Sequence, residues 1–326
     1  MKKKIIKKKS PRKKLSLYIH KYEKGLHLLL SPLILLVLVC ILHFIVLNIK
    51  SQAVRQQVAR DSVRLEPLPY LFFAKPISPI LTAEAAIIID RDAKTVLYEK
   101  NSHLRFSMAS TTKIVTALVA LDHFKPHDVL IAKRSRVEGV NVGVEIGDTL
   151  YFRDALYAML LPSGNDIAMM IADNYPGGQK VFVEKMNKKM KELHLLNTHF
   201  ADPAGLDDDG NYTTALELAQ LAAHASKNVT VAEIVATKTK IISTADGSKI
   251  FSLTNLNKLL GYEGVVGLKT GHTEGAGDVL LTSVVSNGHT FIVVVMRSQD
   301  RFFDTEILLS YITSGIASFK PKFNDY

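Results

Sequence analysis

The segment that decides the fold is Phe106-Ser107-Met108-Ala109-Ser110-Thr111-Thr112-Lys113, which opens the run Ser110–Leu121. This run is apolar nearly all round and predicts a helix that is buried on every side. Ser110 and Lys113 are three residues apart and would share one helical face. A serine hydroxyl needs a neighbour to take its proton, and a buried lysine with a lowered pKa can do so. Taken alone, the pair also fits an N-cap serine followed by an ordinary lysine.

The sequence on both sides of this helix predicts an α/β (α+β) domain. Four runs have strand composition, and Asn287-Gly288 between the last two is a strong hairpin signal. They are Ala86–Asp90, Thr95–Glu99, Val279–Val285 and Thr290–Met296. Between them, Phe182, Met186, Met190 and Leu193 recur at helical spacing, and Thr214 with Glu217 forms a capping box. We therefore expect one antiparallel sheet made by both ends of the domain, beside a mostly helical lobe.

Two further motifs follow at long spacing. Leu161-Pro162-Ser163-Gly164-Asn165-Asp166 lies 53 residues beyond Ser110 and reads as a turn between two helices. Gly267-Leu268-Lys269-Thr270-Gly271-His272 follows at the end of an expected strand, where Gly271 would let a substrate backbone approach. Each motif alone has an ordinary structural explanation. In this order, S-x-x-K, S-x-N and K-T-G form a signature of acyl-transferring serine enzymes.

On these motifs the sequence resembles the D-alanyl-D-alanine carboxypeptidases, the low-molecular-weight penicillin-binding proteins with a serine β-lactamase-like fold. The resemblance covers roughly residues 83–315 and includes Asn197–Asp207 and the approach to the third motif, Glu263–Thr273. It implies hydrolysis of the terminal D-alanine from peptidoglycan stem peptides through an acyl-serine intermediate. It also implies that β-lactams act as acylating inhibitors and that no cofactor or metal is needed.

The resemblance implies catalytic roles for five residues. Ser110 would attack the carbonyl between two D-alanines, with Lys113 taking its proton. Ser163 and Asn165 would pass a proton to the departing amine and hold the substrate amide. Lys269, if it stays protonated, would keep Lys113 neutral by like-charge repulsion and attract the anionic substrate.

The resemblance also implies a set of substrate-binding groups. Thr270 would bind the terminal carboxylate beside Gly271, and the backbone N–H groups of Ser110 and His272 would form the oxyanion hole. Arg301 resembles the carboxylate-binding position of the family, although a solvated arginine at a helix start is an equal alternative. Asp278-Val279 departs from the small or aromatic pair usual in the family.

Three other classes of function fit the sequence less well. A β-lactamase carries a glutamate in an E-x-x-L-N pattern. Here three residues instead of two separate Glu192 from Leu196-Asn197, and Glu192 is expected on the outer face of an amphipathic helix. A non-catalytic wall-binding module with a degenerate site is disfavoured because all the catalytic side chains are present. A metal site is not predicted, since Pro126 separates His123 from His127 and no H-E-x-x-H occurs.

The excess charge lies at the N-terminus. The 326 residues carry a net charge of +10, and residues 1–24 alone hold eleven basic residues and one acid. The rest is neutral, which argues against nucleic-acid binding. Residues 26–49 are 24 uncharged residues, enough to span a bilayer core of about 30 Å, and the preceding lysines would keep the N-terminus in the cytoplasm. A signal peptide cleaved after Ser51-Gln52-Ala53 is the alternative, although the apolar run exceeds its usual length.

The expected organisation is a single-pass cell-membrane protein with an extracytoplasmic enzyme domain. Residues 1–25 are the cytoplasmic tail, 26–49 the transmembrane helix, 50–82 a proline-stiffened stalk, 83–319 the D,D-peptidase domain and 320–326 a C-terminal tail. The cluster Tyr70–Phe73 is too apolar for a free linker and should lie on the domain or on the membrane surface. Cys40 is the only cysteine, so no disulfide stabilises the domain.

Overall fold

The computed structural model describes residues 36–52, 70–206 and 209–319, and the chain separates into two compact units after Glu66. In the first unit, residues 36–52 are helical. Across these described ranges, no helix combines the length and hydropathy that a bilayer crossing requires. Residues 26–35 of the expected transmembrane helix, and both expected terminal tails, lie outside the described residues.

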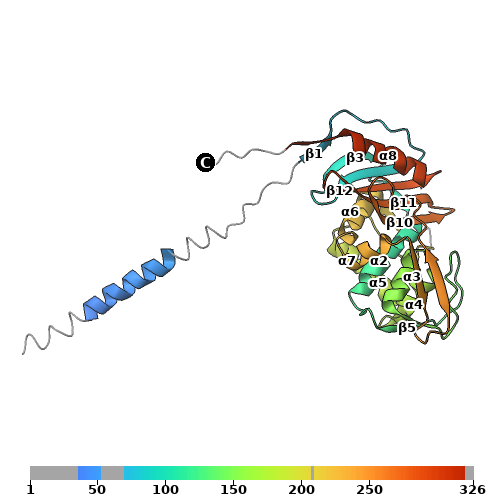
Figure 1. Cartoon of the computed structure of the whole chain (residues 1–326), viewed down its shortest axis with the longest axis horizontal. Coiled ribbons are helices and arrows are strands. Elements are labelled where there is room, and N and C mark those ends of the chain that lie inside the picture. The colour runs from blue at the N-terminus through green and yellow to red at the C-terminus, as the bar shows by residue number, and fades with distance from the viewer. Residues whose placement is uncertain (1–35, 53–69, 207–208, 320–326) are drawn as a thin grey trace, which may run out of the picture. The chain divides into compact units, whose positions relative to one another are not determined.

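The second unit is built on one antiparallel sheet with the strand order β10-β11-β12-β2-β3 (Figure 1). The strands are β10 (Val265–Thr273), β11 (Gly277–Ser286), β12 (His289–Ser298), β2 (Ala85–Asp90) and β3 (Val96–Lys100). Strand β2 pairs with β12, so the first strands of the domain join the last ones as expected. Asn287 and Gly288 have φ angles of 51° and 79°, the left-handed conformation that a tight two-residue hairpin requires.

The sheet is covered on both faces because alternate residues of each strand point to opposite sides. Ile87 of β2 belongs to the core shared with the helical lobe, and its neighbour Ile88 belongs to a second core. In that second core, Leu308 and Ile312 of helix α8 (Arg301–Gly315) pack against the sheet. The sheet is therefore a central layer with α8 on one face and the helical lobe on the other.

The lobe consists of helices and short strand pairs. The helices are α2 (Lys113–Leu121), α3 (Phe152–Leu160), α4 (Asn165–Asn174), α5 (Gly178–Glu192), α6 (Ala215–Ala225) and α7 (Val229–Val235). The strand pairs are β4 (Arg105–Ser107) with β7 (Tyr212–Thr214), β5 (Val129–Ile131) with β6 (Thr149–Tyr151), and β8 (Thr239–Ser243) with β9 (Ile250–Thr254). Residues 113–120 of α2 are all buried, as predicted. The expected cap of α6 is formed, since Thr214 Oγ1 accepts from Glu217 N at 3.1 Å.

The folded unit begins before the expected boundary at residue 83. Strand β1 (Tyr70–Phe73) pairs with β13 (Ile316–Phe319), and the Leu71 side chain is only 2% exposed. Thr82 N and Oγ1 donate to the Asp304 carboxylate at 2.9 and 2.7 Å. The expected stalk, residues 50–82, therefore overlaps the folded unit from residue 70 onward, where Tyr70–Phe73 pairs with the domain, one of the two places expected for this cluster.

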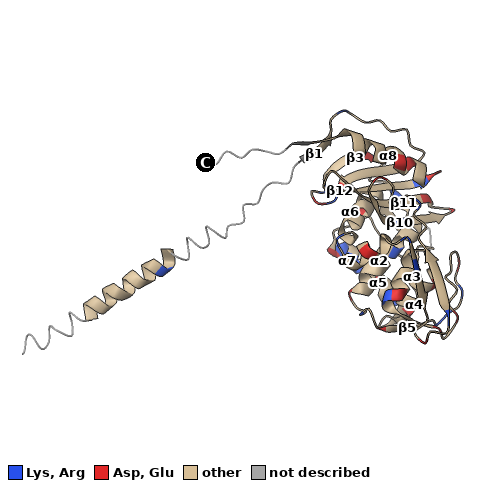
Figure 2. Ribbon diagram, in the orientation of Figure 1, with Lys and Arg blue, Asp and Glu red and all other residues tan. Residues whose placement is uncertain are grey.

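Charged residues of both signs are interspersed along the folded unit (Figure 2). After residue 24 the sequence holds 30 basic and 30 acidic residues, as the totals of 41 and 31 require once the tail is removed. The electrostatic field of the folded unit is therefore set by individual charged residues and not by one strongly charged face.

Candidate active site

The predicted Ser110–Lys113 pair forms at the start of helix α2. Ser110 lies in the 3₁₀ turn η1 (Ala109–Thr112), and α2 begins at Lys113. Side chains three residues apart eclipse in a 3₁₀ turn, which aligns these two more closely than the expected α-helix would. Lys113 Nζ lies 2.8 Å from Ser110 Oγ.

Lys113 is fully buried and has two further partners. Its Nζ donates to Asn165 Oδ1 at 2.6 Å and to the Ala204 carbonyl at 2.8 Å. Both partners are acceptors only, so the two N–H groups of a neutral amine can bind them while its lone pair faces the Ser110 hydroxyl. Burial lowers the pKa of Lys113 to about 7, although the carboxylates of Asp202 and Asp166 act in the opposite direction. Near neutral pH the amine can therefore accept the serine proton.

The second motif occupies the turn between α3 and α4, as predicted. Ser163 is nearly buried and has a φ of 67°, a left-handed conformation that turns the chain sharply before α4 begins at Asn165. Asn165 Nδ2 donates to the Glu138 carbonyl at 2.7 Å, while its Oδ1 accepts from Lys113. The Asn165 amide therefore holds the buried amine in a fixed position and connects it to the loop at residue 138.

The third motif lies within strand β10 and not at its end, which corrects the expectation. Strand β10 is an edge strand of the sheet, so part of its backbone faces away from β11. A Cβ atom added to Gly271 would lie 3.1 Å from the Met108 carbonyl oxygen and 3.2 Å from Ser110 N. A side chain at this position would displace the nucleophile turn by a few tenths of an ångström, so Gly271 allows the close approach of this turn to the strand. The sequence analysis had expected the glycine to allow the approach of substrate.

Lys269 and Thr270 are both buried in β10, beside this turn. Lys269 Nζ donates to the Thr270 carbonyl at 3.0 Å. Burial lowers the pKa of Lys269 well below its ordinary value, and the charges of Lys113 and Arg301 lower it further. The sequence analysis gave Lys269, if it stays protonated, the role of keeping Lys113 neutral. In the structure, burial is the main reason for the lowered pKa of Lys113, and Lys269 is itself shifted toward the neutral form.

Arg301, the first residue of α8, reaches the same strand. Its Nη1 donates to the Gly271 carbonyl at 2.6 Å and to Asp278 Oδ1 at 3.2 Å, and its buried Nε has no hydrogen-bond partner among the described residues. Arg301 is therefore bound to strand β10 and its side chain is only 18% exposed, unlike a freely solvated arginine at a helix start. His272 is exposed, and its Nδ1 lies 2.8 Å from the same oxygen of Asp278.

One part of the site was missed by the sequence analysis, the turn that follows Asp202. The Asp202 carboxylate accepts from Ala204 N at 2.6 Å and from Gly205 N at 2.7 Å. These bonds fix the turn whose Ala204 carbonyl accepts from Lys113. The signal that could have revealed it is Asp202-Pro203-Ala204-Gly205, since aspartate, proline and glycine at these positions are typical of a side-chain-stabilised turn.

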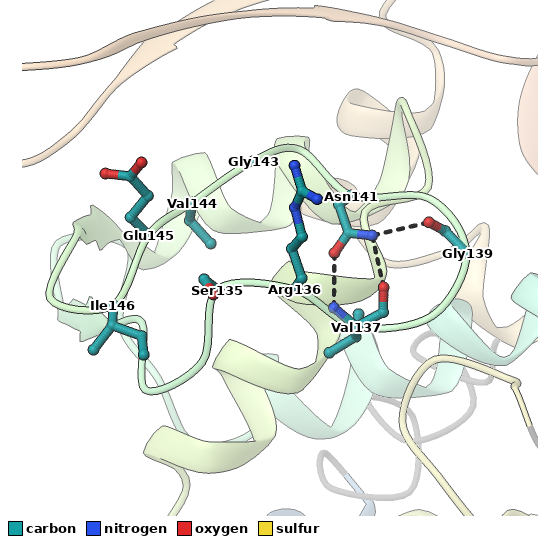
Figure 3. A pocket seen from close by; sticks show the side chains of 9 residues that line it. All are labelled: Ser135, Arg136, Val137, Gly139, Asn141, Gly143, Val144, Glu145 and Ile146. Atoms are coloured by element: carbon teal, nitrogen blue, oxygen red, sulfur yellow. Dashed lines mark hydrogen bonds between the residues drawn. The ribbon is translucent and has the colours of Figure 1, made fainter.

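A second missed element is the loop 135–146, which borders the site and lines a cavity of about 860 Å³ (Figure 3). The Asn141 side chain binds backbone groups of the same loop and holds its curve. The Asp166 carboxylate accepts from Val142 N at 3.0 Å and from Gly143 N at 2.9 Å. Asn165 and Asp166 together therefore connect this loop to the buried lysine.

A buried lysine held against a serine hydroxyl is the arrangement that serine enzymes with a lysine base require. A family model described as D-alanyl-D-alanine carboxypeptidase, peptidase family S11, matches residues 74–300. The chain therefore belongs to the family of serine-type D-alanyl-D-alanine carboxypeptidases, which confirms the resemblance seen in the sequence.

Individual relatives agree with this family. The D-alanyl-D-alanine carboxypeptidase DacF of Bacillus subtilis is 33% identical over 222 residues, 66% of this chain and 57% of that protein. A D-alanyl-D-alanine endopeptidase of Pseudomonas aeruginosa is 31% identical over 249 residues, 74% of this chain and 80% of that protein. The crystal structure of the Streptomyces K15 DD-transpeptidase superimposes with a TM-score of 0.68 at 31% identity, covering 72% of this chain and 98% of that one. The mixed α/β fold is thus that of the penicillin-binding transpeptidases.

Proposed function

We propose that this protein removes the terminal D-alanine from peptidoglycan pentapeptide stems through an acyl-serine intermediate on Ser110. The observation that carries the proposal is the contact of 2.8 Å between Lys113 Nζ and Ser110 Oγ. The amine is fully buried and its pKa is lowered to about 7, so it can serve as the general base.

In the proposed acylation, the Ser110 hydroxyl gives its proton to Lys113 while Oγ attacks the carbonyl between the two D-alanines. The backbone N–H groups of Ser110 and His272 stabilise the oxyanion, each by about 3–4 kcal/mol in comparable sites. Ser163 relays the proton to the departing amine, and free D-alanine leaves. Water then attacks the acyl-serine with the same base, which releases the shortened stem and restores Ser110.

Substrate binding is proposed to use the edge of β10 and the groups around it. An extended peptide can pair with the outward-facing backbone of an edge strand. The Thr270 hydroxyl and the Arg301 guanidinium would bind the terminal carboxylate, since Arg301 retains unused N–H donors beside Gly271. Lys269 would add positive charge when it is protonated.

The test is incubation of the purified enzyme with a peptide that ends in D-Ala-D-Ala, followed by measurement of free D-alanine. Wild type should release it, and Ser110→Ala should reduce release by at least a thousandfold while keeping the same thermal unfolding midpoint. Fluorescent penicillin should label wild type covalently and leave Ser110→Ala unlabelled. Equal release or equal labelling by the two proteins would disprove the assignment.

β-Lactams are proposed to act as slow-release inhibitors and not as substrates. Glu192 ends helix α5, its side chain is 58% exposed, and it pairs with Lys188 at 3.3 Å. Because the Glu192 carboxylate faces solvent and Lys188, we expect it to take no part in deacylation, and Glu192→Gln should leave the rate of penicillin release unchanged. Rapid catalytic turnover of penicillin by wild type would favour the β-lactamase alternative instead.

We also propose that an N-terminal helix holds the enzyme domain at the outer face of the cell membrane, with residues 1–25 in the cytoplasm and a stalk before residue 70. The support is the +10 charge of residues 1–24 followed by the uncharged residues 26–49. The full chain should remain with membranes after alkaline washing, and a variant without residues 26–49 should not. A mature protein whose N-terminus lies just after Ala53 would show cleavage as a signal peptide and contradict the tether.

A further inference from the structure

Asp278 occupies a distinctive position beside the proposed carboxylate site. It lies opposite His272 in the β10–β11 ladder. Its Oδ1 is 2.8 Å from His272 Nδ1 and 3.2 Å from Arg301 Nη1. The side chains of Asp278 and Arg301 are only 22% and 18% exposed, so their charges interact with less screening than on an open surface.

Arg301 is only partly used by these contacts. A guanidinium has five N–H donors, and Nη1 accounts for the bonds to Gly271 and Asp278. The buried Nε has no partner among the described residues, which leaves a donor that a bound ligand could satisfy. Arg301 therefore has N–H groups beyond these two bonds with which to bind a substrate carboxylate, but it already faces one carboxylate from the protein.

We propose that Asp278 is a specificity-determining residue that weakens the binding of the substrate's terminal carboxylate to Arg301. The inference rests on the proposed function, because it assumes that Arg301 binds that carboxylate. A substrate carboxylate at Arg301 comes close to the negative charge of Asp278 and is repelled by it. Solvent reaches Asp278 and screens this repulsion, so we expect Asp278 to weaken the binding of the substrate carboxylate by about tenfold.

The consequence is a low preference for peptides with a free C-terminal carboxylate over peptides in which that group is neutral. The enzyme should therefore accept D-Ala-D-Ala bonds whose C-terminal side is capped, at a modest cost in kcat/KM. The competing explanation is that Asp278 serves only to hold Arg301 in place. That explanation predicts no gain in carboxylate binding, because a neutral residue that keeps the contacts would hold Arg301 equally well and one that loses them would hold it less well.

The test compares Asp278→Asn with wild type on two matched peptides, one ending in D-Ala-D-Ala with a free carboxylate and one with a C-terminal amide. The asparagine oxygen can still accept from Arg301 and His272, so the variant removes charge and keeps both contacts. Glu274→Gln is the control, since it removes an exposed negative charge from the same β10–β11 turn without a contact to Arg301.

Asp278→Asn should raise the acid-to-amide ratio of kcat/KM about tenfold, through a lower KM for the acid, while Glu274→Gln leaves the ratio unchanged. An unchanged or lower ratio in Asp278→Asn would overturn the inference. Asp278→Ser, also neutral, gives the same readout if the asparagine variant does not fold. If wild type cleaved neither peptide and penicillin failed to label Ser110, the proposed function itself would fail, a result distinct from an unaltered ratio.

Discussion

Replacement of Asn165 by aspartate tests the source of the basicity of Lys113. Asn165 Oδ1 lies 2.6 Å from Lys113 Nζ, so Asn165→Asp places a carboxylate against the amine with almost no change in shape. A carboxylate at this distance stabilises the ammonium form and raises the pKa of Lys113. We therefore expect acylation to need a higher pH in the variant than in wild type.

The size of the effect follows from the titration of one amine. With a pKa of about 7, Lys113 is about one-tenth neutral at pH 6 and about nine-tenths neutral at pH 8. The wild-type acylation rate should therefore rise about tenfold over this interval. An opposite charge within about 4–6 Å changes a pKa by roughly 1–3 units, so the neutral fraction in Asn165→Asp at pH 6 should fall by about 10- to 1000-fold.

The assay is the second-order rate constant for acylation by fluorescent penicillin, measured between pH 5.5 and pH 9.5. Asn165→Ala is the control because it removes the hydrogen bonds of the amide to Lys113 and to the Glu138 carbonyl without adding charge. Asn165→Ala should lower the acylation rate constant at every pH, and the inflection of its pH profile should lie near that of wild type. If the inflection of Asn165→Asp coincided with that of Asn165→Ala, the argument that Lys113 acts as a neutral base would be refuted.

Three further substitutions test the packing that builds the site. Gly271→Ala should lower acylation by at least tenfold, because its Cβ would press on the turn of Ser110, whereas Gly315→Ala, with its nearest contact at 3.5 Å, should not. Asp202→Asn should lower the free energy of unfolding in urea by about 1–3 kcal/mol, since it weakens buried charge-assisted hydrogen bonds. An unchanged free energy would show that the turn is stable without the Asp202 carboxylate. Leu71→Ala should lower the same free energy by about 3 kcal/mol, and Phe72→Ala, 41% exposed, by clearly less. Equal losses at residues 71 and 72 would contradict the burial of β1.

The predictable parts of the molecule were those encoded by local pattern. The capping box at Thr214, the Asn287-Gly288 hairpin and the all-round apolar face of α2 were read correctly, because each depends on neighbours within a few residues. The pairing of Ser110 with Lys113 was also predicted, since a spacing of three residues holds in either kind of helical turn.

What could not be predicted depends on groups that meet across the chain. The Ala204 carbonyl reaches Lys113 from 91 residues away, and a backbone acceptor has no residue-type signature. The start of the folded unit could not be predicted for a related reason, because β1 is a short strand whose partner β13 lies near the far end of the sequence. The lowering of the pKa of Lys269 could not be read from the sequence, because it comes mainly from burial of this side chain in the folded sheet.

The pairing of β1 with β13 has a practical consequence for engineering. Tyr70 is directly opposite Phe319 in this ribbon, so the chain enters and leaves the folded unit at adjacent points. A short linker could join the two ends, and new termini could be opened in an exposed turn such as Asn287-Gly288. A circular permutant of this kind would keep every catalytic side chain in its native surroundings.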